Sequence, residues 1–534
     1  MVREVPSKPY EGQKPGTSGL RKTTRVFQQP NYAENFLQSV FDVSPPAPGA
    51  VIVIGGDGRF HNHTVIQQAI RIAAANGFAK ALVGKAGILS TPAASHLIRK
   101  NGAAGGLVFS ASHNPGGPDA DFGIKYNVAS GGPAPEAITE AVYRRSLNVS
   151  RWLTVDTPDV DLGTLGEIQV GGMTVAVVDP VADYAELMER LFDFEAIRRW
   201  REEGGTFAFD AMNAVTGPYA TEIFESRLGF PQGTVRRGTP LEDFGGGHPD
   251  PNLAHAEDLA KLMFGEDAPD LGAASDGDGD RNLILGRGRF INPSDSLAVL
   301  AANAHLAPGY RGGIKGIARS MPTSMAADRV AEKLGIGMFE TPTGWKFFAN
   351  LLDAGLVTIC GEESAGTGSD HVREKDGLWA ILLWLNIIAS RRRSVDAIAR
   401  DHWATFGRHY YARHDYEGID AGGAGRLMAE LAGALDTVPG ARGLEFAYTD
   451  PVDGSVSANQ GIIFKFEDGS RIVYRLSGTG TQGATLRIYL ERYEPADGRL
   501  DEPVDKMLAP LATIAAGIAR IAFHCGRDAP DLVT

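Results

Sequence analysis

Short apolar segments of strand length alternate with segments of helical periodicity along most of this chain. Residues 51–54 are apolar and run into a Gly-Gly-Asp-Gly-Arg turn, after which apolar side chains recur every three or four positions through residues 65–73. This pattern predicts a strand, a loop and a helix. Further strands of the same kind are predicted at residues 81–84, 106–109, 206–210 and 357–360. Such alternation is typical of α/β domains with mainly parallel sheets, whose active groups lie on loops at the carboxyl ends of the strands.

The last part of the chain has a different pattern. Apolar runs at residues 461–466 and 471–475 are joined by Glu-Asp-Gly-Ser, which indicates a hairpin. A glycine-rich and hydroxyl-rich loop, a further strand at residues 485–491 and a helix from about 504 to 523 follow. The sequence therefore predicts three similar α/β domains with mixed, mainly parallel sheets and a C-terminal α+β domain. Their expected bounds are residues 1–180, 181–292, 293–395 and 408–534.

The composition is consistent with a large soluble enzyme. The chain has 534 residues and a formal net charge of −13, which argues against a nucleic-acid or anionic-membrane partner. The most apolar stretch, residues 378–389, is too short to span a bilayer, and the first residues lack the apolar core of a signal peptide. Cys360 and Cys525 have no metal-ligand spacing. A cytoplasmic protein is therefore expected.

The segment Asp-Gly-Asp-Gly-Asp-Arg at residues 276–281 places three carboxylates at alternate positions of a flexible loop. Carboxylate oxygens suit hard cations, so Asp276, Asp278 and Asp280 are predicted to hold a divalent ion, with Mg²⁺ the best candidate. An EF-hand calcium loop would need Gly at its sixth position and Glu at its twelfth, where this chain has arginines. A solvated acidic turn is the remaining alternative, and the strand-like flanks at 271–274 and 282–285 make it the weaker one.

Ser112 follows a predicted buried strand and is followed by His113 and an Asn-Pro-Gly-Gly turn. This places a hydroxyl on a sharp bend, where it can accept or donate a group. A Ser-His-Asp hydrolase would need a Gly-x-Ser-x-Gly elbow or a clear remote base, and the sequence shows neither. Beside a carboxylate metal loop, Ser112 becomes a candidate phosphoserine.

The Ser-Gly-Thr-Gly-Thr-Gln-Gly segment at residues 477–483 is a candidate phosphate-binding loop. Its glycines would free backbone N–H groups, and Arg475 and Arg487 flank it. No Gly-Lys-Ser/Thr follows, so it is not a P-loop. A flexible polar hairpin tip is the simpler alternative.

Several long motifs, in order along nearly the whole chain, resemble those of the α-D-phosphohexomutases, and most closely the muscle-type phosphoglucomutases. The motifs are residues 16–22, 112–117, 121–127, 131–139, 276–281, 341–348, 361–364, 367–377 and 475–482. The resemblance implies four domains around a central cleft and interconversion of α-D-glucose 1-phosphate and glucose 6-phosphate. A glucose 1,6-bisphosphate intermediate, which also serves as activator, is part of that expectation.

The resemblance also implies roles for individual residues. Ser112 would carry the phosphoryl group and share Mg²⁺ with the three aspartates. Arg21 and Arg281 would neutralise charge on the transferring oxygens, and either His113 or Lys125 would be the general base. The remaining implied ligands of the sugar phosphate are Thr343, Glu362, Ser364, Lys375, Arg475, Ser477, Thr479 and Arg487.

Two positions depart from the family pattern. Ser110 stands where the family usually has Thr, and Ala365 stands where muscle-type enzymes usually carry an aromatic residue. Loss of that ring could loosen sugar selectivity, so a phosphomannomutase or a glucose 1,6-bisphosphate synthase is the alternative enzyme. A catalytically silent relative would be expected to lack Ser112 or a metal carboxylate. A monomer or weak dimer that takes a small sugar phosphate is expected.

Overall fold

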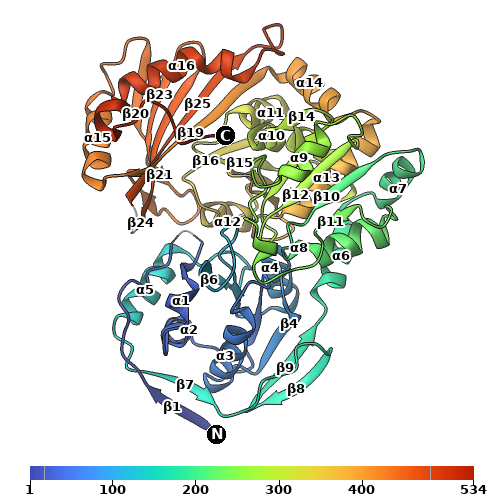
Figure 1. Ribbon diagram of the computed structural model, residues 1–534, viewed down its shortest axis with the longest axis vertical. Coiled ribbons are helices and arrows are strands. Elements are labelled where there is room, and N and C mark those ends of the chain that lie inside the picture. The colour runs from blue at the N-terminus through green and yellow to red at the C-terminus, as the bar shows by residue number, and fades with distance from the viewer. Residues whose placement is uncertain (17, 481–482) are drawn as a thin grey trace. The chain divides into compact units, whose positions relative to one another are not determined.

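The computed structural model describes residues 1–16, 18–480 and 483–534, with the side chains of residues 421, 478–480 and 483 outside the description. The chain divides into two compact units. The first comprises residues 1–293, 302–315 and 344–396, and the second comprises residues 294–301, 316–343 and 397–534. Figure 1 shows the helices and strands of each unit.

The first unit begins with a mixed sheet that carries the serine segment. Along this sheet the strands are β2 (Leu20–Thr23), β6 (Asp121–Val128), β5 (Gly105–Phe109), β3 (Val51–Gly56), β4 (Lys80–Ile88), β9 (Met173–Val178) and β8 (Gly166–Val170). β3 pairs in parallel with β4 and β5, whereas β6 runs antiparallel to β5. A separate ribbon joins β1 (Val2–Pro6) to β7 (Arg151–Val155).

Apolar side chains of β3 explain how helices cover this sheet. Ile52 and Ile54 belong to a buried core that includes Phe36 of α2 (Tyr32–Val43) and Ile66 of α3 (Asn62–Ala75). Alternate residues of a strand face opposite sides of a sheet, so Val53 faces the other layer. There α4 (Thr91–Asn101) packs on β3 and β5. The short helix α1 (Thr24–Phe27) and α5 (Glu136–Ser146) complete this region.

The second sheet of the first unit carries the acidic loop. Its strands lie in the order β11 (Val235–Arg236), β10 (Phe207–Asp210), β12 (Leu271–Ser275), β13 (Asn282–Gly286) and β14 (Arg289–Ile291). β12 and β13 are the two strands predicted to flank residues 276–281. The helices of this region are α6 (Pro180–Leu191), α7 (Phe194–Glu202), α8 (Thr216–Ala220) with a π-helical continuation at Thr221–Arg227, and α9 (Glu257–Met263).

The helix α13 (Gly377–Arg391) is the most apolar segment of the chain, and its residues 377–389 are all buried. It packs against β12, β13 and α7, as expected for a helix that is apolar on every side. Nearby, β17 (Ile359–Gly361) pairs with β18 (Thr367–Ser369), and α12 (Lys346–Asp353) precedes them. No helix among the described residues is long and apolar enough to cross a membrane.

The second unit contains an antiparallel sheet (orange to red in Figure 1) with helices on one face. Its strands lie in the order β20 (Ala441–Glu445), β23 (Ile462–Phe466), β24 (Arg471–Gly480), β25 (Gly483–Glu494), β19 (Arg408–Ile419) and β26 (Leu532–Val533). α15 (Ala421–Gly433), α16 (Val504–Ile518) and α17 (Ile521–Cys525) share a buried core with it. The unit also holds the parallel pair β15 (Gly316–Ser320) and β16 (Gly337–Thr341), with α11 (Ala326–Leu334), and the small hairpin β21 (Tyr448–Thr449) and β22 (Val456–Ser457). α10 (Pro293–Asn303) and α14 (Val395–Phe406) each run from one unit into the other.

Two predictions for this part of the chain were wrong. The helix expected over residues 504–523 is interrupted, because Arg520 has the left-handed φ of 46° and separates α16 from α17. The segment expected as a loop from Ser477 is instead strand: β24 continues to Gly480, and Gly480 pairs with Gly483. The tip at residues 481–482 lies outside the described residues.

Candidate active site

The acidic loop between β12 and β13 is fixed by backbone hydrogen bonds to three other segments. The Thr91 N–H at the start of α4 donates to the Asp278 carbonyl at 2.9 Å. The Gly377 N–H at the start of α13 donates to the Gly279 carbonyl at 3.0 Å, and Gly279 itself adopts a φ of 81° that favours glycine. At the end of the loop, the Asn282 N–H donates to the Ala365 carbonyl at 3.0 Å. The loop is therefore a rigid element rather than a solvated turn.

The three carboxylates converge as a cation site requires. Ligand oxygens of Asp276, Asp278 and Asp280 lie within 4.8 Å of one another, and all three residues are buried. Among the described residues, Oδ1 of Asp278 and Oδ1 of Asp280 find no hydrogen-bond partner. Burial, together with the charges of the two neighbouring aspartates, raises the pKa of Asp276 well above its usual range. Unpartnered buried oxygens and mutual repulsion fit a divalent cation in this loop.

Ser112 lies beside these carboxylates. Its hydroxyl donates to Oδ2 of Asp276 at 3.1 Å, although 164 positions separate the two residues. Ser112 has a φ of 55°, an unusual backbone conformation for a residue other than glycine, and its N–H donates to the Ser110 hydroxyl at 2.7 Å. Strain of this kind concentrates at functional sites. The structure thus brings together the serine and the acidic loop that the sequence singled out separately.

Arg59 holds the serine segment in place, and sequence reasoning did not assign it a role. Its guanidinium donates to the Ser112 carbonyl and to the Asp121 carbonyl, both at 2.8 Å, and pairs with Asp57 at 2.8 Å. Asp57 in turn accepts from the Ser110 hydroxyl at 2.6 Å. The available signal was an Asp and an Arg directly after a predicted buried strand, at the carboxyl end where active groups gather.

Lys125 and His113, the two base candidates, have opposite electrostatic environments. Lys125 pairs with Asp278 and lies 3.5 Å from Oδ2 of Asp280. Burial alone would lower the pKa of Lys125, but these two charges raise it overall, so the ammonium remains protonated. Burial and the charges of Arg281 and Arg21 lower the pKa of His113 well below its usual range. His113 is therefore neutral, with Nδ1 3.4 Å from the Ser112 hydroxyl.

Further cationic side chains surround the same loop. Lys375 lies 3.3 Å from Oδ2 of Asp280, and Arg281 lies 3.7 Å from Asp250. The Nε atoms of Arg21 and Arg281 are buried, and neither has a hydrogen-bond partner among the described residues. Guanidinium N–H groups without partners are suited to an anionic ligand such as a phosphoryl group.

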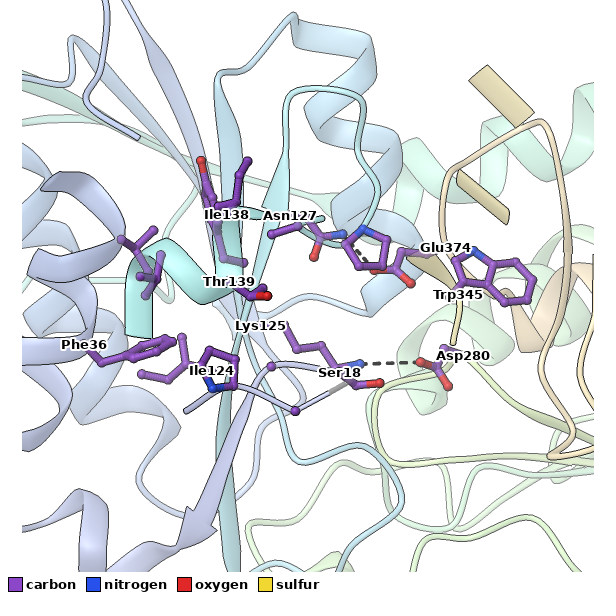
Figure 2. Close-up of a pocket in the computed structure, with 18 of the residues that line it drawn as sticks. Ser18, Phe36, Ile124, Lys125, Asn127, Ile138, Thr139, Asp280, Trp345 and Glu374 are labelled. Carbon is purple, nitrogen blue, oxygen red and sulfur yellow. Dashed lines mark hydrogen bonds and ion pairs between the residues drawn. The ribbon is translucent and has the colours of Figure 1, made fainter. Parts of the chain in front are cut away.

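A pocket opens beside Lys125 and Asp280 (Figure 2). Figure 2 shows Phe36 and Ile138 toward one side of it and Glu374 and Trp345 toward the other. Lys375 is also among the lining residues. Glu374 is a second residue that sequence reasoning did not assign. It accepts from the Asn127 amide at 2.9 Å, and burial raises its pKa to about 7 despite the charge of Lys125.

Glu362 and Ser364 follow β17 in the first unit. Glu362 is buried, accepts from the Gly344 N–H at 2.9 Å, and has its pKa raised by burial. Ser364 is half-buried. Both residues precede Ala365, whose carbonyl accepts a hydrogen bond from the end of the acidic loop. The predicted sugar-binding segment is therefore directly bonded to the acidic loop.

The other predicted ligands belong to the second unit. Thr343 is half-buried, and its hydroxyl has no partner among the described residues. Arg475 and Arg487 lie directly opposite each other on β24 and β25, and Ser477 shares their face. Like charges at opposite positions are unfavourable unless something offsets them, and Asp415 lies 3.7 Å from Arg487. The side chain of Thr479 lies outside the described residues.

A Ser-His-Asp arrangement does occur elsewhere in the first unit, without Ser112. His371 contacts the Ser369 hydroxyl at 2.7 Å and Asp376 at 2.9 Å. Asp376 also accepts from Tyr184, and its side chain and that of His371 are at most 1% exposed. A sealed set of this kind cannot meet a substrate, so its role is to tie β18 to the start of α13.

Comparison with known proteins identifies the family. Models of the phosphoglucomutase/phosphomannomutase α/β/α domains I, II and III match residues 12–151, 182–288 and 293–406. The model of the phosphoglucomutase-1 C-terminal domain matches residues 408–531. The chain belongs to the phosphoglucomutase/phosphomannomutase family. The predicted family resemblance and the predicted fold class are thereby confirmed.

Relatives of full length support the same assignment. The chain is 60% identical to the phosphoglucomutase of Rhizobium radiobacter, and the match covers 100% of both chains. It is 52% identical to the chloroplastic phosphoglucomutase 1 of Marchantia polymorpha, covering 100% of this chain and 85% of that one. The crystal structure of pp63/parafusin from Paramecium, a phosphoglucomutase in an open form, is similar with a TM-score of 0.94 and 46% identity. That match covers 100% of this chain and 99% of the other.

Proposed function

We propose that this chain is a phosphoglucomutase, which interconverts α-D-glucose 1-phosphate and glucose 6-phosphate through a phosphoserine and a glucose 1,6-bisphosphate intermediate. The observation that carries the proposal is the hydrogen bond from Ser112 to Asp276, because a hydroxyl beside three clustered carboxylates suits phosphoryl transfer with a bound cation. Full-length relatives named phosphoglucomutase support the choice of reaction.

Asp276, Asp278, Asp280 and the phosphorylated Ser112 would hold Mg²⁺. Hard oxygen ligands and a small number of protein donors are what this ion prefers. When bound, Mg²⁺ would neutralise charge on the phosphoryl oxygens. Arg21 and Arg281, whose Nε atoms have no partners among the described residues, would do the same from the protein side.

Each half-reaction moves one phosphoryl group. A sugar hydroxyl oxygen forms a bond to the phosphorus carried by Ser112 while the bond from phosphorus to the Ser112 oxygen breaks. The hydroxyl proton passes to a base and is returned to the Ser112 oxygen. The second half-reaction reverses these steps with the other phosphate of the bisphosphate, so the serine ends phosphorylated again.

We propose that His113 is the general base that accepts the proton of the sugar hydroxyl. Its low pKa leaves a neutral imidazole near the reacting oxygen, whereas Lys125 is protonated and paired with two carboxylates. Lys125 would instead orient Asp278 and Asp280 and add positive charge.

The other predicted residues would bind the rest of the sugar phosphate. Glu362 and Ser364 would bind sugar hydroxyls in either orientation, with Thr343 and Lys375 assisting. Arg475, Ser477, Thr479 and Arg487 would bind the phosphate that is not reacting, and the opposed arginines on β24 and β25 support this role. We assign the serine, metal, sugar and phosphate segments to domains at residues 1–180, 181–292, 293–395 and 408–534, respectively.

We further propose that glucose 1,6-bisphosphate activates the enzyme by phosphorylating Ser112. The expected partners are small sugar phosphates, with the protein a monomer or weak dimer in the cytoplasm. Relatives named cytoplasmic support that location, and other relatives are named chloroplastic.

A coupled assay tests the reaction. With Mg²⁺ and trace glucose 1,6-bisphosphate, conversion of glucose 1-phosphate to glucose 6-phosphate should be at least tenfold faster than conversion of mannose 1-phosphate or glucosamine 6-phosphate. Comparable rates on all three sugar phosphates would overturn glucose specificity. The assay therefore also tests whether Ala365, in place of an aromatic residue, loosens sugar selectivity. Intact mass should show one phosphoryl group on the wild type that glucose 6-phosphate removes. Retention of mutase activity by Ser112→Ala would refute the phosphoserine mechanism.

A further inference from the structure

Two histidines and an aspartate form a second cluster of potential metal ligands, separate from the acidic loop. Ligand atoms of His248, Asp250 and His255 lie within 4.8 Å of one another. All three come from the segment between β11 and α9, and the proposed reaction uses none of them.

His248 is held in an orientation that suits a metal ligand. Its ring stacks on that of His113, with centroids 6.3 Å apart and an interplanar angle of 11°. This stacking restricts rotation of the His248 ring, so its in-plane nitrogens keep a fixed direction.

Asn252 places the other two ligands. Its amide donates to Oδ2 of Asp250 at 2.9 Å, and its Oδ1 accepts from the His255 N–H, also at 2.9 Å. This turn brings His255 back toward His248, so that their ring centroids lie 4.1 Å apart. Oδ1 of Asp250 forms a long ion pair with Arg281, at 3.7 Å.

The donor set differs in chemistry from the acidic loop. Two imidazoles and one carboxylate suit Zn²⁺ and related transition ions, whereas three carboxylates suit Mg²⁺. Three protein ligands also leave a fourth position for water. We propose that His248, Asp250 and His255 form a second cation site that takes a transition ion of the Zn²⁺ class.

Occupancy of this site would affect the proposed reaction, and this consequence rests on the proposed function. The ion would bind Asp250 and place positive charge beside Arg281 and His113. Asp250 would then no longer offset the charge of Arg281, a residue that the proposed reaction uses. Zn²⁺ should therefore inhibit phosphoryl transfer without displacing Mg²⁺ from the acidic loop.

The first test measures binding alone and does not depend on activity. Co²⁺ is titrated into the full-length protein in excess Mg²⁺, and visible absorption reports nitrogen-ligated Co²⁺. We expect one equivalent in the wild type and at least a tenfold loss of affinity in His255→Asn. His305→Asn, at an exposed histidine outside the cluster, should bind as the wild type does. Equal affinity of His255→Asn and wild type, or no nitrogen-ligated Co²⁺ in the wild type, would overturn the site.

The second test measures inhibition. In Mg²⁺ alone, His255→Asn should retain wild-type mutase activity, because this side chain contacts no residue of the proposed reaction. Added Zn²⁺ should inhibit the wild type and His305→Asn at least tenfold more strongly than His255→Asn. Equal inhibition of all three would refute the regulatory consequence. Absence of activity in Mg²⁺ alone would instead count against the proposed function and leave the Co²⁺ result standing.

Discussion

Gly277 of the acidic loop lies directly against the backbone of Ser112. A Cβ atom on Gly277 would come 2.2 Å from the Ser112 carbonyl oxygen, a separation that no real Cβ contact shows. The same carbonyl accepts from Arg59. The close approach of these two loops therefore depends on the missing side chain and sets the distance between the serine and the carboxylates.

Gly277→Ala is expected to separate the two loops while leaving the fold intact. Displacement of reacting groups by about 1 Å costs on the order of 10²-fold in rate, so kcat should fall by about that factor. Gly172→Ala is the control, because a Cβ there meets nothing within 4 Å. Steady-state kinetics with circular dichroism would measure both, and a fully active Gly277→Ala would show that the loops can move apart without cost.

Arg59→Lys should impair catalysis through the position of Ser112. Arg59 reaches its three partners from three separate nitrogens, whereas all donors of a lysine lie on one nitrogen, so the bonds to the Ser112 and Asp121 carbonyls would not both survive. A partly satisfied buried charge pair with Asp57 should cost about 3–5 kcal/mol of unfolding free energy. Because Arg59 does not touch the proposed substrate, kcat should fall more than KM rises. Arg25→Lys, in an exposed pair with Asp119, should change stability by less than about 0.5 kcal/mol.

Mg²⁺ is expected to raise the thermal stability of the protein. Without a cation the three buried carboxylates repel one another. Burial and this repulsion both raise the pKa of Asp276. An ion that binds only the folded chain stabilises it by about 2.7 kcal/mol at a concentration of 100 Kd. Differential scanning calorimetry with EDTA and with Mg²⁺ should show a higher Tm with the ion. Asp278→Asn should reduce that increase, and an unchanged increase would place the ion elsewhere.

The loops at the ends of strands were the part of the site that sequence alone could predict. Residues 276–281 do join two strands, and Ser112 does follow a buried strand, because apolar periodicity is a local property. The contact between Gly277 and Ser112 could not be predicted from the sequence. It depends on how two sheets approach each other, and the sequence around a turn glycine does not indicate whether a carbonyl group packs against it.

The error at residues 477–480 also arose from a contact that local sequence does not reveal. Gly478 and Gly480 suggested a loop, yet the ladder between β24 and β25 continues to Gly480, with a register shift between Ser477 and Thr479. Pairing with a neighbouring strand overrides the low strand propensity of glycine. Arg59 and Glu374 were missed because single charged residues acquire a role only from the buried groups around them.

Asp295→Asn is expected to remove a pH dependence of stability in the second unit. Burial raises the pKa of Asp295 to about 6, despite the charges of Arg408 and His409. The unfolded chain ionises this group near its ordinary pKa of about 3.9 and the folded chain only near 6, so the unfolded state releases the proton first. Stability should therefore fall as pH rises from about 4 to about 6 and should change no further through this group above that.

The amide introduced by Asp295→Asn would keep an acceptor for the Trp403 indole, which lies 3.3 Å from Asp295, without carrying a charge. At pH 8 the variant should be more stable than the wild type by about 1–3 kcal/mol, and at pH 4 the two should be nearly equal. Urea unfolding at both pH values measures this difference. Asp267→Asn, at an exposed position, should follow the wild type throughout. A stability gap between Asp295→Asn and wild type that does not change with pH would mean that this carboxyl is already ionised in the folded protein at pH 4.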